Sequence, residues 1–222
     1  LLSSTLMYYY LLERKVNATW VDVRDLIRTD NNFREAIVDW DFTRKKIQET
    51  ILPDLEKYDV VVTQGFIAAT DENESTTLGR EGSDFSAAIF ADCLDAEEVS
   101  IWKDVDAVMN ADPKQFDDAV NLPHLNYAEI IEMAYYGAQV IHPKTIKPLQ
   151  NKNIVLKVKS FLNPELPGTE IDNKTLGNLP AIKVLKNNQV LIYFTTKDFS
   201  FIEGKPVAAL HEIFNTHKIK AN

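Results

Sequence analysis

The segment TTLGREGSDFSAAIFA, residues 76–91, joins a glycine-bearing turn to an apolar run that favours a buried helix. Gly79 and Gly82 allow the chain to turn tightly and let its backbone approach a ligand closely. Between them, Arg80 carries a planar guanidinium group whose donors suit a carboxylate or a phosphate. The turn is therefore a candidate binding site for an anion.

Ser83 and Asp84 follow this turn, at the start of a helix expected over residues 83–94. Both residue types are good N-caps, and an aspartate in the first turn interacts favourably with the helix dipole. The residues alone leave two interpretations open. Either the pair only caps the helix and Arg80 is a surface residue, or all three side chains bind a ligand.

Short β-branched runs alternate with helical patterns along the chain. Strands are expected at 18–23, 58–65, 97–102 and 153–160, and helices at about 42–57, 83–94, 126–136 and 143–150. This alternation predicts an α/β fold with a mostly parallel sheet covered on both faces. Ligands of such sheets bind beside the carboxyl ends of strands, so the loops after 58–65 and 97–102 are the expected site.

The second of these loops reads KDVDAVMNADPK, residues 103–114, and is polar and acidic. It holds three acids and two flanking lysines: Asp104, Asp106, Asp112, Lys103 and Lys114. Three acids in one loop suggest a metal ion, but the spacing of an EF-hand is absent. A solvated, turn-rich loop is the competing interpretation.

Composition narrows the function classes. The 222 residues carry a formal net charge of −9, and no basic tract points to a nucleic acid. A single cysteine, Cys93, rules out an internal disulfide and a Cys-rich zinc site and fits a reducing, cytoplasmic setting. No apolar run reaches the ~20 residues that span a bilayer. P-loop, GxGxxG, CxxC and nucleophile-elbow motifs are also absent.

The two ends of the chain differ in character. Residues 1–15, LLSSTLMYYYLLERK, predict a core helix entered partway, so a domain is expected to begin upstream. Residues 163–180 contain three prolines and two glycines and predict a linker. Beyond them, a strand is expected at 189–196 and an amphipathic helix at 205–217.

Four segments, taken together and in order, resemble the aspartokinase family. They cover nearly the whole chain and are VVTQGFIAATDENESTTLGREGSDFSAA (61–88), IWKDVDAVMNADPK (101–114), MAYYGAQVIHPKTIKPL (133–149) and LNPELPGTEI (162–171). The first is similar to the family's Gln-Gly-Phe-Ile-Gly and Thr-Thr-Leu-Gly-Arg-Gly-Gly-Ser-Asp motifs. The second resembles Ile-Trp-Thr-Asp-Val-x-Gly-Val-Tyr-x-x-Asp-Pro-Arg, and the third resembles Phe-Gly-Ala-Lys-Val-Leu-His-Pro-x-Thr. The fourth matches the stretch that closes the kinase domain.

The resemblance implies the amino-acid-kinase fold, a three-layer α/β/α sandwich with a mostly parallel sheet, followed by a partial, ferredoxin-like ACT domain. Residues 1–170 would form the catalytic domain, 171–180 a linker and 181–222 the start of the ACT domain. The implied activity is transfer of the ATP γ-phosphoryl group to the side-chain carboxylate of L-aspartate, the first step toward lysine, threonine and methionine. Mg²⁺ would be held mainly through the phosphates.

The resemblance also implies partners: lysine or threonine as a feedback inhibitor at the ACT domain, and a homodimer or higher homo-oligomer. For the site, it implies that Arg80 clamps a substrate carboxylate, that Ser83 holds the amino acid and that Asp84 orients both it and a catalytic lysine. The implied nucleotide-binding residues are Lys103, Asp104, Met109, Lys114 and Gln139. No metal ligand is implied among the protein's side chains.

The chain departs from the family's motifs at several positions. Lys103 replaces Thr, Ala107 replaces Gly, Met109 replaces Tyr, Lys114 replaces Arg, Gln139 replaces Lys and Glu81 replaces Gly. Gln139 removes a cation that Lys103 can restore from the same side of the nucleotide. The family's Lys-Phe-Gly-Gly-Thr-Ser segment, with its catalytic lysine, is expected upstream of Leu1, so residues 1–222 alone are expected to be inactive.

Two alternatives stay open. One is a non-catalytic, effector-binding or assembly piece with the same fold. The other is a related kinase that acts on acetylglutamate, glutamate or uridylate, against which the Gly-Arg-x-Gly-Ser-Asp turn and the His142-Pro143 segment argue. The sequence leaves open the identity of the feedback amino acid and whether a homoserine dehydrogenase domain follows.

Overall fold

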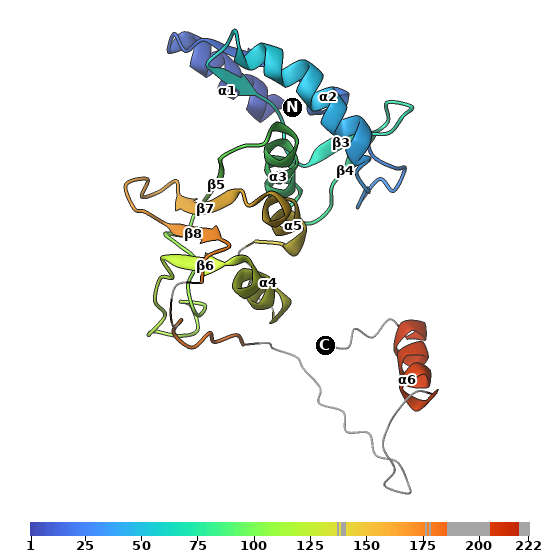
Figure 1. The fold of residues 1–222 in the computed structure, drawn as a ribbon, viewed down its shortest axis with the longest axis vertical. Helices are drawn as coiled ribbons and strands as arrows, with labels where there is room; N and C mark the ends of the chain where they lie inside the picture. Colours follow the sequence, from blue (N-terminus) through green and yellow to red (C-terminus); the bar gives the residue numbers. More distant parts are fainter. Residues whose placement is uncertain (137, 139–140, 176, 178, 186–204, 218–222) are drawn as a thin grey trace, which may run out of the picture. The chain divides into compact units, whose positions relative to one another are not determined.

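The computed structural model describes most of the chain, drawn in Figure 1. The described residues are 1–136, 138, 141–175, 177, 179–185 and 205–217. They belong to two compact units, Leu1–Leu185 and Lys186–Asn222. In the second unit the structure describes helix α6 (Lys205–Thr216), which confirms the helix predicted there. The strand predicted at 189–196 lies outside the described residues.

Two small sheets form the amino-terminal part of the first unit. Strand β1 (Ala18–Trp20) pairs in parallel with β2 (Val60–Val62), and β3 (Ile67–Ala69) pairs antiparallel with β4 (Ser75–Thr77). A 3₁₀ turn, η1 (Val23–Asp25), follows β1. One buried apolar cluster joins these elements to neighbouring helices through Val23, Leu26, Ile27, Ile47, Ile51, Ala68, Leu78 and Ile89.

Helix α2 (Trp40–Leu55) begins at a side-chain cap. The Asp39 carboxylate accepts a hydrogen bond from the Phe42 amide at 3.1 Å, which satisfies one of the free donors at the helix start. The helix predicted at about 42–57 is therefore confirmed, two residues earlier than expected.

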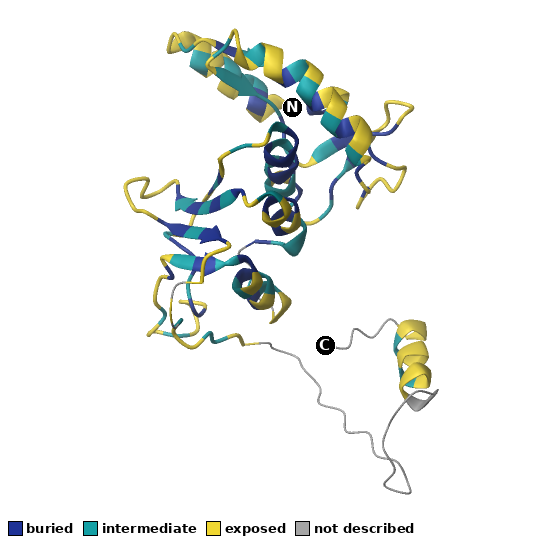
Figure 2. Ribbon diagram, viewed as in Figure 1, coloured by how far each residue is buried: buried dark blue, intermediate teal, exposed yellow. Residues whose placement is uncertain are grey.

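Helix α1 (Leu2–Glu13) forms as predicted, but its predicted burial is wrong for the described structure. Only Ser4 of this helix is buried, and its hydroxyl accepts a hydrogen bond from the Trp20 indole at 3.1 Å. Apolar side chains such as Leu2, Leu6 and Tyr9 are exposed, as Figure 2 shows for the outer surface of the helix. The reason is that β1 and β2 together offer too little surface to cover a helix that is apolar all round.

The rest of the first unit contains a four-stranded sheet and the helices packed beside it. Its strands are β5 (Glu98–Lys103), β6 (His124–Asn126), β7 (Val155–Ser160) and β8 (Thr169–Asp172), in the order β5-β7-β8-β6. β5 and β7 are parallel, β6 and β8 are parallel, and β7 and β8 are antiparallel. Within the described residues, three of the five strand pairs are parallel, in the α/β fold that the alternating pattern predicts.

Helix α3 (Gly82–Leu94) lies at the centre of the helical packing. It contacts both α2 and α5 (Pro143–Lys152), and α4 (Tyr127–Tyr136) packs on α5. Figure 2 shows that α3 is largely buried, in contrast to α1 and α2. Helices α3, α4 and α5 confirm the predictions at 83–94, 126–136 and 143–150. No helix in the described ranges is long and apolar enough to cross a membrane.

Polar side chains fix the carboxyl end of α3. The buried Asp92 forms an ion pair with Arg44 of α2 at 2.7 Å, and Lys152 of α5 donates to the Asp92 carbonyl oxygen at 2.5 Å. Burial raises the pKa of the adjacent Cys93 thiol to about 11, so the thiol is protonated and unreactive at neutral pH. The opposite end of α3, which bears the glycine turn, is thus carried on a fixed helix.

The structure corrects the predicted linker at 163–180. Residues 169–172 form β8, which lies between β7 and β6 inside the four-stranded sheet. Gly168 has a φ of +74°, and a Cβ at this position would lie 2.1 Å from the Val158 carbonyl oxygen, so the turn into β8 requires glycine. The first unit also extends to Leu185, so residues 181–185 belong to it rather than to the following unit.

One charged cluster in this sheet gives a prediction for acid stability. Asp172 accepts hydrogen bonds from the Lys174 amide at 2.7 Å and pairs with His124 at 2.8 Å. Burial alone raises the pKa of Asp172, but the bonds from Lys174 and His124 outweigh it and lower the pKa to about 2. Because this lies below the unfolded value of 3.8, the stabilisation is fully present above about pH 4 and is lost as the pH falls toward 2.

We therefore expect Asp172→Asn to remove about 2 kcal/mol of the acid-dependent part of the free energy of unfolding. Urea unfolding of the wild type and the variant, measured from pH 6 down to pH 2, checks this. Asp59→Asn, at an exposed aspartate, is the matched control. If the wild type and Asp172→Asn lose stability in parallel between pH 4 and pH 2, Asp172 is not the responsible group.

Candidate functional site

The glycine turn, defined here as residues 78–84, leads from β4 into α3 by a tight reversal. Gly79 has a φ of +79°, and the Gly82 amide donates a hydrogen bond to the Gly79 carbonyl oxygen at 3.1 Å. A Cβ at Gly82 would lie 2.7 Å from the Phe66 ring, so the chain has no room for a larger residue there. The two glycines thus shape the turn in the way that the sequence indicates.

The loop after β2 is fixed onto the start of α3. A Cβ at Gly65 would lie 3.1 Å from the Ser83 Cα, so this loop passes close to the helix start. The Phe66 amide donates to Ser86 Oγ at 2.9 Å, and the Leu78 amide donates to the Phe66 carbonyl oxygen at 2.9 Å. The first of the two predicted site loops therefore reaches the glycine turn directly.

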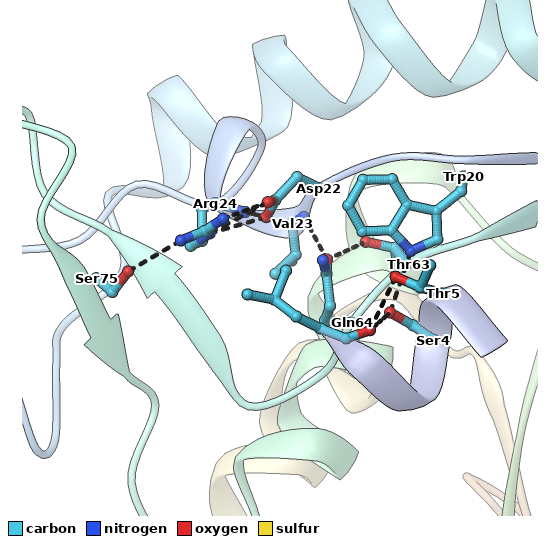
Figure 3. A network of polar contacts seen from close by, with 10 residues as sticks. Ser4, Thr5, Trp20, Asp22, Val23, Arg24, Thr63, Gln64 and Ser75 are labelled. Atoms are coloured by element: carbon cyan, nitrogen blue, oxygen red, sulfur yellow. Dashed lines mark hydrogen bonds and ion pairs between the residues drawn. The ribbon is translucent and has the colours of Figure 1, made fainter. Parts of the chain in front are cut away.

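Gln64 anchors that loop, in the polar network drawn in Figure 3. Its Oε1 accepts hydrogen bonds from the Val23 amide at 2.7 Å and from the Thr63 hydroxyl at 3.3 Å. Its Nε2 is buried and makes no hydrogen bond with any described residue. In the same view Arg24 binds Asp22 at 2.6 Å and Ser75 of β4 at 3.3 Å, so that arginine is occupied within the fold.

The residues predicted to bind the substrate differ in their exposure and in their contacts with the rest of the chain. Arg80 and Ser83 are exposed, and within the described part of the chain neither side chain makes a hydrogen bond or an ion pair. Asp84 lies in the first turn of α3 and is partly buried. A free guanidinium and a free hydroxyl beside the amino end of a helix provide donors and a favourable dipole for an anion.

Asp84 joins the glycine turn to the second predicted loop. Its Oδ2 forms an ion pair with the Lys103 Nζ at 3.0 Å, and the two side chains are 18% and 23% exposed. Lys103 is the last residue of β5, so the pair connects the start of α3 to the carboxyl end of a strand. The structure thus brings together one residue predicted for the substrate and one predicted for the nucleotide.

The remaining residues of the second loop serve different purposes. Asp104 and Lys114 are exposed and Met109 is half-buried. Asp112 caps a turn by accepting from the Lys114 amide at 2.9 Å, and Asp106 accepts from the Asn163 side chain at 2.8 Å. In the part of the chain that the structure describes, no three acidic, histidine or cysteine side chains gather to hold a metal ion. Gln139 lies outside the described residues.

Thr169 closes the base of the second loop, which is a role that the sequence reasoning missed. Its buried hydroxyl accepts a hydrogen bond from the Val108 amide at 2.8 Å and donates to the Leu122 carbonyl oxygen at 2.6 Å. The segment 108–122 is therefore clamped at both ends by one side chain of β8. A threonine that follows a Pro-Gly pair carries no local signal for such a contact.

Glu81 stands where a glycine would fit the backbone better. It adopts the left-handed conformation, with φ +52° and ψ +32°, and its Oε2 is buried without a hydrogen-bond partner among the described residues. We expect Glu81→Gly to raise the free energy of unfolding by about 1 kcal/mol, because glycine occupies this region without the steric cost. Urea unfolding measures the change.

Lys15→Gly is the matched control for this prediction, because Lys15 is exposed and also has a positive φ, of +61°. The control reports the backbone contribution alone, so any excess in Glu81→Gly comes from the buried carboxylate. A neutral or destabilising Glu81→Gly would show that the Glu81 side chain makes a compensating contact.

Comparison with known proteins identifies the family to which the chain belongs. The sequence model of the amino acid kinase family matches residues 1–160. The chain belongs to this family. Among solved amino acid kinases, the structure is similar to E. coli aspartokinase III in complex with aspartate and ADP, with a TM-score of 0.75 and 38% identity over 78% of this chain and 39% of that one. The lysine and aspartate complex of that aspartokinase gives a TM-score of 0.70 and 39% identity, over the same shares of the two chains.

The sequence relatives of this amino acid kinase chain are also aspartokinases or contain an aspartokinase part. It is 39% identical over 194 residues to the lysine-sensitive aspartokinase 3 of Escherichia coli, covering 86% of this chain and 43% of that protein. It is 38% identical over 170 residues to a chloroplastic bifunctional aspartokinase/homoserine dehydrogenase 2 of Arabidopsis thaliana, covering 76% of this chain and 18% of that protein. The chain thus spans less than half the length of these relatives.

Proposed function

We propose that this amino acid kinase chain forms the aspartate site and part of the nucleotide site of an aspartate kinase. The observation that carries the proposal is the Asp84–Lys103 ion pair, which joins the glycine turn to the loop predicted for the nucleotide. The similarity to aspartokinases, one of them solved with aspartate and ADP, supports the choice of substrate. The reaction would transfer the ATP γ-phosphoryl group to the side-chain carboxylate of L-aspartate.

On the aspartate side, the free donors match the substrate. Arg80 would bind a carboxylate of L-aspartate through two parallel hydrogen bonds, and Ser83 would hold the amino acid at the start of α3. Asp84 is negatively charged and would repel a phosphate, so its part is to orient the substrate ammonium group or a neighbouring cation. In the structure the cation beside Asp84 is Lys103.

On the nucleotide side, we assign Lys103, Asp104, Met109, Lys114 and Gln139. The lysines suit the phosphates by charge, and Asp104 suits the ribose or the base. Mg²⁺, when bound through the phosphates, would neutralise part of their charge. Lysine in place of arginine at position 114 keeps the charge but gives up bidentate geometry, so this contact is expected to tolerate small shifts of the phosphate.

The chemistry needs alignment more than proton transfer. The attacking carboxylate is already ionised near neutral pH, so no strong base is required. One of its oxygens would attack the γ-phosphorus as the bond to the β–γ bridging oxygen breaks, which yields 4-phospho-aspartate and ADP. Arg80 would fix the nucleophile in line, and Lys103 would neutralise charge that spreads over the phosphoryl group.

The proposal extends to the whole protein. We propose a three-layer α/β/α sandwich as the complete catalytic fold, to which the first unit, Leu1–Leu185, contributes, and an ACT domain beyond that unit. Lysine or threonine would act on that domain as a feedback inhibitor, in a homodimer or higher homo-oligomer. A catalytic lysine outside the described residues would complete the phosphate site.

Substrate discrimination tests the proposed function. The complete protein is incubated with MgATP and, in separate reactions, L-aspartate, L-glutamate, N-acetyl-L-glutamate or UMP, and ADP release is followed. Of the four acceptors, we expect only L-aspartate to cause ADP release. Hydroxylamine should trap the acyl phosphate product as a hydroxamate. ADP release with another acceptor would show that this acceptor, rather than L-aspartate, is the substrate. ADP binding without any turnover would favour a non-catalytic role.

A further inference from the structure

The last residues of the first unit run along the nucleotide-side loop. Residues 179–185, called here the exit segment, directly precede Lys186, where the second compact unit begins. Leu179 and Ile182 pack against the large apolar cluster of the first unit. The exit segment is thus attached to the body of the first unit and is also the covalent route to the second.

Asn110 connects this exit segment to the loop that bears Lys114. The side-chain amide of Asn110 donates to the Ala181 carbonyl oxygen at 3.0 Å. The backbone carbonyl oxygen of Asn110 accepts from the Lys183 amide at 2.8 Å. On the other side, Asn110 exchanges two hydrogen bonds with Val120. Its amide donates to the Val120 carbonyl oxygen at 3.0 Å, and its Oδ1 accepts from the Val120 amide at 2.8 Å.

Through these four contacts, each polar group of Asn110 makes a hydrogen bond, and the residue is only 5% exposed. They close the loop from Asn110 to Val120, within which Lys114 stands exposed. The side chain of Lys183 reinforces the connection through an ion pair with Asp118 of the same loop. A buried asparagine whose backbone and side-chain groups are hydrogen-bonded fixes its neighbours, because a shift leaves a buried donor or acceptor unpaired.

We propose that Asn110 is a positioning residue that makes the pose of the Lys114 loop depend on the exit segment. The inference rests on the proposed nucleotide site and deepens it. Asn110 itself does not touch the nucleotide. It holds the loop closed through Val120 and ties it to residues 181–183, so a displacement of the exit segment would move the loop.

The test approaches the contact from both sides in the complete protein. Asn110→Ala removes the side-chain bonds to Ala181 and Val120. Lys183→Pro removes the amide that donates to Asn110, whereas Lys183→Ala keeps that amide and loses the surface ion pair with Asp118 and the cation–π contact with the Phe116 ring. ADP binding is measured by calorimetry without aspartate, and KM for ATP and for L-aspartate is measured separately.

We expect Asn110→Ala and Lys183→Pro each to weaken ADP binding and raise KM for ATP by about tenfold, with KM for L-aspartate unchanged. Lys183→Ala should stay within about twofold of the wild type, in line with the small contribution of surface ion pairs. Hydrogen exchange of the Val120 amide should quicken in Lys183→Pro. A merely structural role would lower the melting temperature without moving ADP affinity.

The outcomes separate this inference from the function on which it rests. ADP binding that neither Asn110→Ala nor Lys183→Pro alters would overturn the inference and leave the kinase proposal intact. Wild-type protein that binds ADP but phosphorylates another acceptor would overturn the aspartate assignment, and the tenfold loss would still support the role of Asn110. A wild type that binds no ADP would contradict both.

Discussion

Replacing Arg80 with alanine is expected to lower kcat/KM for L-aspartate by about 30- to 1,000-fold in the complete protein, with little change in ADP affinity. Arg80 lies between the two glycines of the turn, exposed and without a hydrogen bond or ion pair in the described structure, so its donors are available to a ligand. A charge-assisted pair that the bound substrate covers typically contributes about 2–4 kcal/mol, which gives this range.

The geometry of the arginine provides a second variant. Arg80→Lys keeps the charge but loses the paired donors, so we expect activity between those of the wild type and Arg80→Ala. Arg34→Ala is the matched control, because Arg34 is also exposed and its backbone carbonyl contacts Thr77, next to the turn. Steady-state kinetics at saturating ATP measure all three. A normal kcat/KM for aspartate in Arg80→Ala would remove Arg80 from the site.

Breaking the Asp84–Lys103 pair is expected to slow phosphoryl transfer by about 100-fold, which is the usual cost of losing one well-placed charge-stabilising group. Lys103→Met removes the cation and leaves the Asp84 carboxylate, at 18% exposure, without its partner. Asp84→Asn leaves the lysine in place but no longer held. We therefore expect both single variants to lower kcat strongly and Lys103→Met also to weaken ADP binding.

A double-mutant cycle distinguishes a shared role from two separate ones. If Asp84 acts through Lys103, the double variant should be about as slow as Lys103→Met alone, with strongly non-additive effects on kcat. Lys157→Met is the control, since Lys157 pairs with Glu98 at 2.6 Å at the other end of β5. Additive losses in the cycle, or a kcat close to the wild type in Lys103→Met, would contradict a joint role.

Helices were predictable where local chemistry determines them. The run from 83 to 94 follows a glycine turn and is largely apolar, and α3 covers Gly82–Leu94; its N-cap is Glu81, without a side-chain cap bond, rather than Ser83 or Asp84. Pro143 sets the start of α5, with His142 as its N-cap. In both cases the residues that begin the helix stand within a few positions of it, so a single sequence contains the signal.

The short strands β6 and β8 were not predictable from the sequence, whereas β1 and β2, which are as short as β6, lie within the apolar runs at 18–23 and 58–65. β8 has four residues after Pro167 and Gly168, and β6 has three residues. β8 is a strand because it pairs with β7 on one side and with β6 on the other. Local composition there favours a loop, and only the hydrogen bonds supplied by the sheet overrule it.

In the candidate site, too, features set by neighbouring residues were predictable from the sequence, and contacts between distant residues were not. Arg80, Ser83 and Asp84 could be singled out from the turn and the family motif. The pairing of Asp84 with Lys103 could not, since the residues belong to different elements and meet only through the packing of α3 against β5. Asn110 was missed because an asparagine in a polar loop is typical of a solvated turn, and its partners lie at 120 and at 181–183.

A crystal structure of the complete protein with L-aspartate and ADP tests the central claim most directly, because that claim places aspartate at the start of α3 and the nucleotide on the adjoining loop that begins at Lys103. We predict that a carboxylate of aspartate lies within hydrogen-bond distance of the Arg80 guanidinium and that the ADP phosphates lie on the side of Lys103 and Lys114. Aspartate bound away from residues 78–84, or ADP bound away from the loop that begins at Lys103, would contradict it.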